Sequence, residues 1–128
     1  MGNNRTKGNS FEVSIVNQLK KIGYNFAKTT RNSSRMLDNC KIDIDFVPYL
    51  IQCKVGYDKN RPKGDKIFQE MYDELKKNIP PDNPIHSYPP ILIHHIDNRK
   101  KTNQLFTTTT EFGMELLRVY KLYLDGKL

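Results

Sequence analysis

Two adjacent segments of alternating polarity constrain the fold of this chain more than any other feature. The first, KIDIDFV, sends its apolar side chains to one face of a β-strand and Asp43 and Asp45 to the other. The second, YLIQCKV, does the same with Gln52 and Lys54. Because only Pro48 separates the two segments, we expect them to pair as a hairpin, with the four polar side chains on one surface.

The remaining segments predict alternating helices and strands within one domain that spans all 128 residues. Helices are expected where apolar residues recur at helical spacing, over residues 10–22, 65–78 and 111–124. Strands are expected over residues 24–31, 41–47, 49–55, 91–96 and 104–110, with loops over 32–39, 56–64 and 79–90. This order predicts an α/β class, in which a central mixed sheet of about five strands is flanked by helices.

Charge is distributed unevenly along the chain. The formal net charge is +7, and residues 1–41 hold eight basic residues against two acidic ones. We interpret residues 1–9 as a basic, flexible N-terminal arm, and the basic N-terminal third as favouring a polyanionic partner such as a nucleic acid. A generic solvated basic surface explains the charge alone equally well.

Composition argues against a membrane or secreted protein. No apolar run approaches the length that crosses a bilayer, and residues 1–10 lack the hydrophobic core of a signal peptide. Cys40 and Cys53 are too few for a disulfide framework and lack metal-binding spacing. The side chains of His94 and His95 would diverge on a strand, so a zinc site is not expected. We therefore expect a cytoplasmic protein without a membrane partner.

The polar surface of the predicted hairpin is the candidate functional site. Asp43, Asp45, Gln52 and Lys54 would converge there, and Glu12, in the first turn of the opening helix, could reach the same point. Oxygen ligands beside a lysine suit the binding of Mg²⁺ and the activation of a water molecule.

The order of four motifs resembles the PD-(D/E)xK nuclease superfamily, and within it the archaeal and phage Holliday-junction resolvases. KGNSFE is similar to the family's helix start, basic-Gly-x-x-Phe-Glu, and RNSSR is similar to its phosphate-binding loop rich in Arg and Ser. KIDIDFVPYLIQCK looks like the family's Asp, short hairpin and (Glu/Asp)-x-Lys. IFQEMYDEL carries a Gln on the following helix, where related nucleases have one.

The resemblance implies a restriction-endonuclease-like fold and the metal-dependent hydrolysis of DNA phosphodiester bonds. Because a four-way junction needs two cuts, it also implies a homodimer that makes them in pairs. The implied cofactor is Mg²⁺, or Mn²⁺ in its place. Its ligands would be the side chains of Glu12, Asp43 and Gln52 and the backbone carbonyl of Cys53.

The same resemblance assigns roles to residues around the metal. Lys54 would orient the attacking water, and Gln69 would hold that water or a nearby phosphate. Contacts to the DNA backbone would come from Arg5, Lys7, Arg31, Ser33, Ser34 and Arg35. Such a nuclease would act in DNA recombination or repair, in a bacterial, archaeal or phage-infected cell.

Gln52 departs from the family pattern, in which Glu or Asp occupies its position. An amide oxygen can coordinate a hard cation, but the exchange removes one negative charge, so we expect the affinity for Mg²⁺ to fall by more than about tenfold. Asp45, on the same strand face as Asp43, could restore the missing charge. The alternatives are a weakly catalytic or non-catalytic DNA-binding protein on the same fold, an engineered inactive form, and a restriction or repair endonuclease for linear duplexes.

Each candidate residue also has a purely structural explanation. Glu12 stands three residues after Asn9, as in a capping box that needs no metal. The two aspartates could form the solvent face of an amphipathic strand, and Lys54 could protect an edge strand from aggregation. Gln69 could be an exposed helix residue. We favour the site because these separate explanations leave the order of the motifs unexplained.

Overall fold

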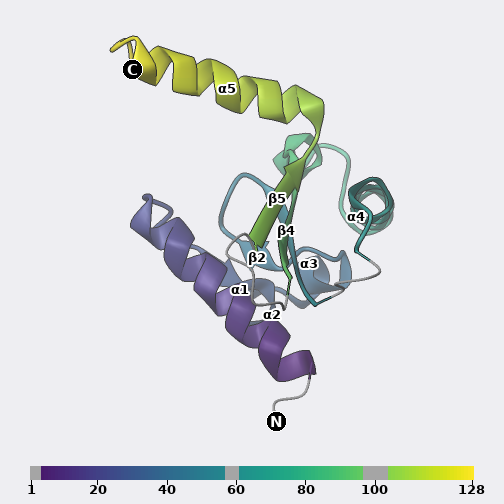
Figure 1. The fold of residues 1–128 in the computed structure, drawn as a ribbon. Helices are drawn as coiled ribbons and strands as arrows, with labels where there is room; N and C mark the ends of the chain where they lie inside the picture. The colour runs from purple at the N-terminus through teal and green to yellow at the C-terminus, as the bar shows by residue number, and fades with distance from the viewer. Residues whose placement is uncertain (1–3, 57–60, 97–103) are drawn as a thin grey trace.

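The computed structural model of the protein describes residues 4–56, 61–96 and 104–128. Figure 1 shows α1 and α4 on opposite sides of the strands, with α5 extending away from this body. The elements are α1 (Asn4–Lys21), β1 (Lys28–Thr29), α2 (Thr30–Ser33), α3 (Arg35–Asn39), β2 (Ile44–Asp45), β3 (Leu50–Val55), α4 (Gly64–Asn78), the 3-10 helix η1 (Pro84–Ser87), β4 (Pro90–His95), β5 (Gln104–Thr108) and α5 (Thr110–Leu124). The predicted α/β class is confirmed.

The strands form two separate sheets within the described residues. β3 pairs in parallel with β4, and β4 pairs antiparallel with β5, so the larger sheet is mixed. β1 and β2 form a second, antiparallel ladder of two residue pairs. The described strands are therefore divided between a three-stranded and a two-stranded sheet, instead of forming one continuous central sheet.

The hairpin predicted between residues 41–47 and 49–55 is wrong for the described structure. β2 pairs with β1 instead, and the link to β3 is a main-chain hydrogen bond from Asp43 N to Ile51 O, 2.8 Å long. The reason lies in the connection, because Phe46 adopts a left-handed conformation with φ of 64° and turns the chain out of the ladder. Phe46 is consequently 58% exposed, while the other apolar residues of its segment are buried.

Two apolar clusters, one on each face of the larger sheet, fix the helices to it. On one face, Ile51 and Ile91 pack against α1 through Phe11, Ile15 and Val16. On the other face, Leu50 and Leu92 pack against the buried stripe of α4, which is Ile67, Phe68, Met71 and Leu75. This stripe was predicted from its spacing and is confirmed. Burying one such side chain stabilises the fold by about 1.5–3 kcal/mol, so several together hold each helix in place.

α1 is longer at its start than the sequence pattern indicates. It begins at Asn4, and so extends into the segment that we expected to be an arm. No proline interrupts this segment, and a helix tolerates its single Gly8 at a cost of about 1 kcal/mol. Glu12 therefore lies in mid-helix, which excludes the capping box with Asn9. At the other end α1 stops at Lys21, and Ile22, predicted on its buried stripe, is 73% exposed.

The segment between α1 and β2 differs most from expectation. The strand predicted over residues 24–31 is reduced to Lys28–Thr29, because Gly23, with φ of 114°, begins a turn. Residues 32–39, predicted as a loop, contain the end of α2 and all of α3. α3 forms because Ser34 caps it, with its Oγ accepting a hydrogen bond from Leu37 N at 3.2 Å.

α5 is attached to the body by its first turn. Thr109 caps it by accepting a hydrogen bond from Phe112 N at 3.2 Å, and Phe112 packs on Tyr49 with ring centroids 5.7 Å apart. No residue of α5 is buried. None of the described helices combines the length and the apolarity that a membrane span requires.

Candidate active site

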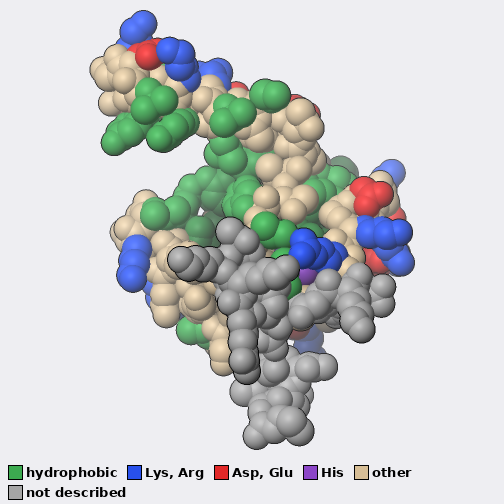
Figure 2. All heavy atoms as spheres, viewed as in Figure 1, with side chains coloured by type: hydrophobic (Ala, Val, Ile, Leu, Met, Phe, Trp, Pro, Cys, Tyr) green, Lys and Arg blue, Asp and Glu red, His purple; other side chains and the backbone are tan. Residues whose placement is uncertain are grey.

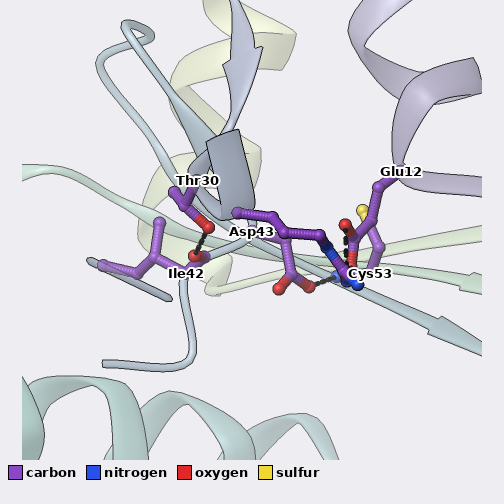
Figure 3. A network of polar contacts seen from close by, with 6 residues as sticks. Glu12, Thr30, Ile42, Asp43 and Cys53 are labelled. Atoms are coloured by element: carbon purple, nitrogen blue, oxygen red, sulfur yellow. Dashed lines mark hydrogen bonds and ion pairs between the residues drawn. The ribbon is translucent and has the colours of Figure 1, made fainter. Parts of the chain in front are cut away.

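Asp43 lies at the edge of β3, where residues 41–47 and residues 49–55, the two halves of the predicted hairpin, separate. Its backbone N–H donates to Ile51 O, as in an antiparallel ladder, but the next ladder position is taken by its side chain. Oδ2 of Asp43 accepts a hydrogen bond of 2.7 Å from Cys53 N (Figure 3). The carboxylate thus replaces the missing strand partner of Cys53, and its position is set by the backbone of β3.

Thr30 holds the main chain on the other side of Asp43. Its backbone N–H donates to Asp43 O at 2.9 Å, and its Oγ1 donates to Ile42 O at 2.6 Å (Figure 3). Thr30 is itself 1% exposed, so water does not compete for these bonds. Asp43 is therefore fixed from both β3 and α2, as a precisely positioned functional group requires.

Glu12 reaches the same place from α1. The packing of its neighbour Phe11 on the sheet carries Glu12 inward, and only 7% of Glu12 is exposed. Figure 3 shows its carboxylate directed toward Cys53, beside Asp43. Nη2 of Arg31 lies 3.2 Å from each of the two Glu12 oxygens. Arg31 was predicted as a DNA contact, and in the structure it pairs with a candidate metal ligand.

The site accumulates negative charge away from solvent. The pKa of Asp43 is raised to about 7, chiefly by burial and also by the charges of Glu12 and Asp38, against the lowering effects of the hydrogen bond from Cys53 N and of the charge of Lys54. Burial also raises the pKa of Glu12 above its usual range, although Arg31 opposes this shift. Burial and the two carboxylates raise the pKa of the Cys53 thiol as well. A cation that entered this site would stabilise the ionised carboxylates.

Gln52 lies on the opposite face of β3 from Cys53. The alternation of the strand places it with Leu50 on the α4 side, and it is 7% exposed. Within the described residues its Oε1 accepts no hydrogen bond. A buried acceptor left unsatisfied costs about 1–3 kcal/mol, so this amide oxygen calls for a ligand or a functional explanation. Lys54 shares its face and is half-buried, close enough to lower the pKa of Asp43.

The available donors fit a hard divalent cation by their chemistry. Carboxylate, amide and carbonyl oxygens are the ligands that Mg²⁺ accepts in proteins. Among the described residues, no group of three or more His, Cys, Asp or Glu side chains could hold a metal ion. A cation at Glu12 and Asp43 would therefore need Gln52 Oε1, the Cys53 carbonyl or water to complete its ligands.

Asp45 and Gln69, which were also predicted near the site, form hydrogen bonds with residues other than Glu12 and Asp43. Ser33 Oγ donates to Asp45 Oδ2 at 2.8 Å, and Phe46 N donates to Asp45 Oδ1 at 2.8 Å, so both Asp45 oxygens are engaged in the turn before β3. Gln69 is exposed on α4 and donates to Asp73 at 2.9 Å.

The predicted DNA contacts are dispersed. Ser34 is occupied in capping α3, and Arg35 is exposed in the first turn of that helix. The side chains of Arg5 and Lys7 lie outside the described residues. Of the predicted set, Cys53, Lys54 and Arg31 thus have contacts or charges that reach Glu12 or Asp43, and Gln52 lies beside Cys53 on the opposite face of β3 with its Oε1 unsatisfied.

Two contributors were not predicted from the sequence. Thr30 has no charge and belonged to an expected strand, and Asp38, whose charge raises the pKa of both Glu12 and Asp43, belonged to an expected loop. The signal that could have found Asp38 is the cap at Ser34, which makes residues 35–39 helical.

Comparison of the chain with protein-family models, with curated proteins and with solved structures found no match. Any functional conclusion therefore depends on the chemistry of the site and on the motifs of the sequence.

Proposed function

We propose that the protein is a metal-dependent endodeoxyribonuclease of the PD-(D/E)xK type, with a restriction-endonuclease-like fold and Mg²⁺ as its cofactor. The observation that carries the proposal is the meeting of Glu12 and Asp43 at Cys53, with Lys54 nearby and the pKa values of both carboxyls raised. A buried carboxylate, Glu12, beside a partly buried one, Asp43, is costly for the fold, and a divalent cation would offset that cost. The buried, unsatisfied Oε1 of Gln52 adds a potential oxygen ligand.

The residues of the site have complementary tasks in this proposal. Glu12, Asp43, Gln52 and the Cys53 carbonyl would hold the cation, which when bound supplies a water of lowered pKa and neutralises charge on the phosphate. The Lys54 ammonium orients the attacking water and stabilises the charge that develops on phosphorus. Thr30 keeps Asp43 in place through its two main-chain hydrogen bonds.

Arg31 has one observed contact, with Glu12, and one predicted contact, with the DNA backbone. In the described structure it neutralises Glu12. When a cation takes over that role, the guanidinium can bind a DNA phosphate in the bidentate geometry that Arg favours. The substrate proposed from the motifs is branched DNA, cut in pairs at a four-way junction by a homodimer in recombination or repair.

A non-catalytic DNA-binding protein is the second candidate. It is favoured by the Arg31–Glu12 ion pair, because a protein cation already neutralises this carboxylate. The neutral Gln52 favours it too, since the acidic ligand of the family is missing.

The two candidates separate in a cleavage assay on a labelled four-way junction, with a linear duplex of the same sequence as a second substrate. Mg²⁺ and Mn²⁺ are tested separately, beside Asp43→Asn. Paired nicks in the junction arms that vanish in the variant support the proposed nuclease, and equal cleavage of the duplex indicates a restriction or repair enzyme. Salt-sensitive binding without cleavage in either metal supports the DNA-binding protein.

A further inference from the structure

α5 carries an apolar stripe that nothing in the described part of the chain covers. No residue of the helix is buried. Large apolar side chains are 36–63% exposed along it: Met114, Leu116, Leu117, Val119, Tyr120, Tyr123 and Leu124. Figure 2 shows hydrophobic atoms gathered on the side of α5 that faces the rest of the molecule. A contiguous patch of this kind on a protein surface marks an interaction site.

A second apolar surface lies beside the helix. A groove of about 360 Å³ is lined by the end of α1, by one face of the larger sheet and by the start of α5. Its lining includes Leu19, Ile93, Phe106 and Leu116, and every lining residue is apolar or Tyr. A neighbouring hollow of about 490 Å³ follows α5 and shares Leu116 with the groove. The helix stripe and the groove therefore form one continuous surface.

α5 follows β5 directly, which restricts how far the helix can turn toward the groove. β5 ends at Thr108, the cap is Thr109 and the helix begins at Thr110, so no linker residues separate strand and helix. Its first turn is also held to the body by Phe112, which packs on Tyr49 with ring centroids 5.7 Å apart. No other described residue occupies the groove, so we consider an occupant from another molecule.

A second copy of this chain fits the groove better than a charged partner. The polar side of α5 is neutralised within the helix, because Arg118 pairs with Glu115 and Lys121 pairs with Asp125. The exposed apolar side chains of α5 offer on the order of 800 Å² per chain, comparable to one partner's share of a stable interface. A two-fold axis presents each copy's stripe to the other copy's groove, and both are buried at once.

We propose that α5 is the docking element of a symmetric homodimer, in which the α5 helix of each copy covers the apolar groove of the other. The proposal identifies the surface through which this chain self-associates. It does not depend on the nuclease chemistry, because no residue of the candidate active site takes part in the surface.

The test is the mass of the full chain by light scattering after gel filtration and by sedimentation velocity, without DNA or metal. Tyr120→Glu changes the α5 stripe and Phe106→Glu changes the groove, at side chains 58% and 56% exposed, so neither should disturb the fold of one copy. The matched control is Arg118→Glu, which also introduces a Glu into α5, but on the polar side of the helix. Circular dichroism checks that each variant keeps its helices.

We expect the unaltered chain and Arg118→Glu to have twice the mass of one chain, and both apolar variants to weaken the dimer at least about 30-fold. A monomer at every concentration overturns the proposal. It is also overturned by a dimer that survives either apolar substitution, because reciprocal docking needs both the stripe and the groove. Cleavage plays no part in these readouts, so a failed dimer and a failed nuclease remain distinguishable.

Discussion

Replacing Asp43 by Asn should make the fold more stable, by an amount that depends on pH. The Asn side chain keeps the shape of Asp, and its Oδ1 can still accept the hydrogen bond from Cys53 N. What it removes is a buried charge. The pKa of Asp43 is raised from 3.8 to about 7, chiefly by burial. Since the folded pKa lies above the unfolded one, the fold is favoured while Asp43 is protonated, and it loses this support as pH rises from about 4 to about 7.

The pKa shift sets the magnitude. Each unit corresponds to about 1.4 kcal/mol, so ionised Asp43 destabilises the fold by roughly 4 kcal/mol near pH 8 and roughly 2 kcal/mol near pH 5. Asn carries no such penalty. The free energy of unfolding of Asp43→Asn, relative to the unaltered chain, should therefore rise by roughly 2 to 3 kcal/mol from pH 5 to pH 8.

Urea unfolding at the two pH values measures this difference, and the comparison of differences cancels any constant effect of the substitution. The control is Asp82→Asn, at an exposed carboxyl, which should change the free energy of unfolding by the same amount at both pH values. Millimolar Mg²⁺ should stabilise the unaltered chain near pH 8 and leave Asp43→Asn unaffected. An Asn variant whose advantage is the same at both pH values would refute the reasoning, because Asp43 would then not titrate in this range.

Three further substitutions test single features of the structure. Gln52→Glu restores an acidic ligand, so it should raise the affinity for Mg²⁺ by more than about tenfold and increase the rate of cleavage. Thermal stabilisation by Mg²⁺ measures the affinity, and the nicking rate measures cleavage. If neither changes, the result contradicts a metal site. Ser34→Ala removes the cap on Leu37 N and should lower the free energy of unfolding by about 1 kcal/mol in urea. Phe46→Gly removes the strain of a non-glycine residue in the left-handed conformation and should raise the free energy of unfolding by about 1 kcal/mol. Phe26→Gly, at an exposed Phe with negative φ, should lower it. Equal effects of the two substitutions would rule out strain at Phe46.

The parts of the fold that were predictable are those with a complete periodic signal. β3 alternates over its whole length, and α4 carries an apolar stripe between polar faces, so pattern alone locates both. The candidate carboxylates Glu12 and Asp43 were also identified from the sequence, because their motifs fix positions relative to these elements. Their meeting at Cys53 follows from the packing of α1 on the sheet.

The features that could not be predicted from the sequence depend on single contacts between segments that are far apart in the sequence. The pairing of Arg31 with Glu12 joins residues 19 positions apart and exists only because α2 replaces the end of a predicted strand. Likewise, the separation of the predicted hairpin depends on the conformation of Phe46 and on one hydrogen bond that the Asp43 side chain accepts from Cys53 N. Periodicity contains no information on either, since both are local exceptions to a regular pattern.

If the protein is the proposed nuclease, the charges of the site would couple the binding of metal to the binding of DNA. Glu12 and Asp43 are balanced by Arg31 and Lys54, so a divalent cation has to compete with Arg31 for Glu12. In the proposed nuclease, a released Arg31 would be a free guanidinium beside the site, and a DNA phosphate would be its partner. Each ligand therefore lowers the cost of binding the other, and the coupling is reciprocal.

This coupling is measurable with Ca²⁺, which seeks the same oxygen ligands as Mg²⁺. We expect Ca²⁺ to tighten junction binding at least about fivefold at constant ionic strength, and junction DNA to tighten Ca²⁺ binding by the same factor. Arg31→Ala should abolish this effect, because no guanidinium then has to leave Glu12 before the metal ion binds. Arg35→Ala, at an exposed Arg of α3, should weaken DNA binding equally with and without Ca²⁺. If Ca²⁺ tightens DNA binding as much in Arg31→Ala as in the unaltered chain, the exchange of partners at Glu12 does not occur, and Arg31 is a structural ion-pair residue.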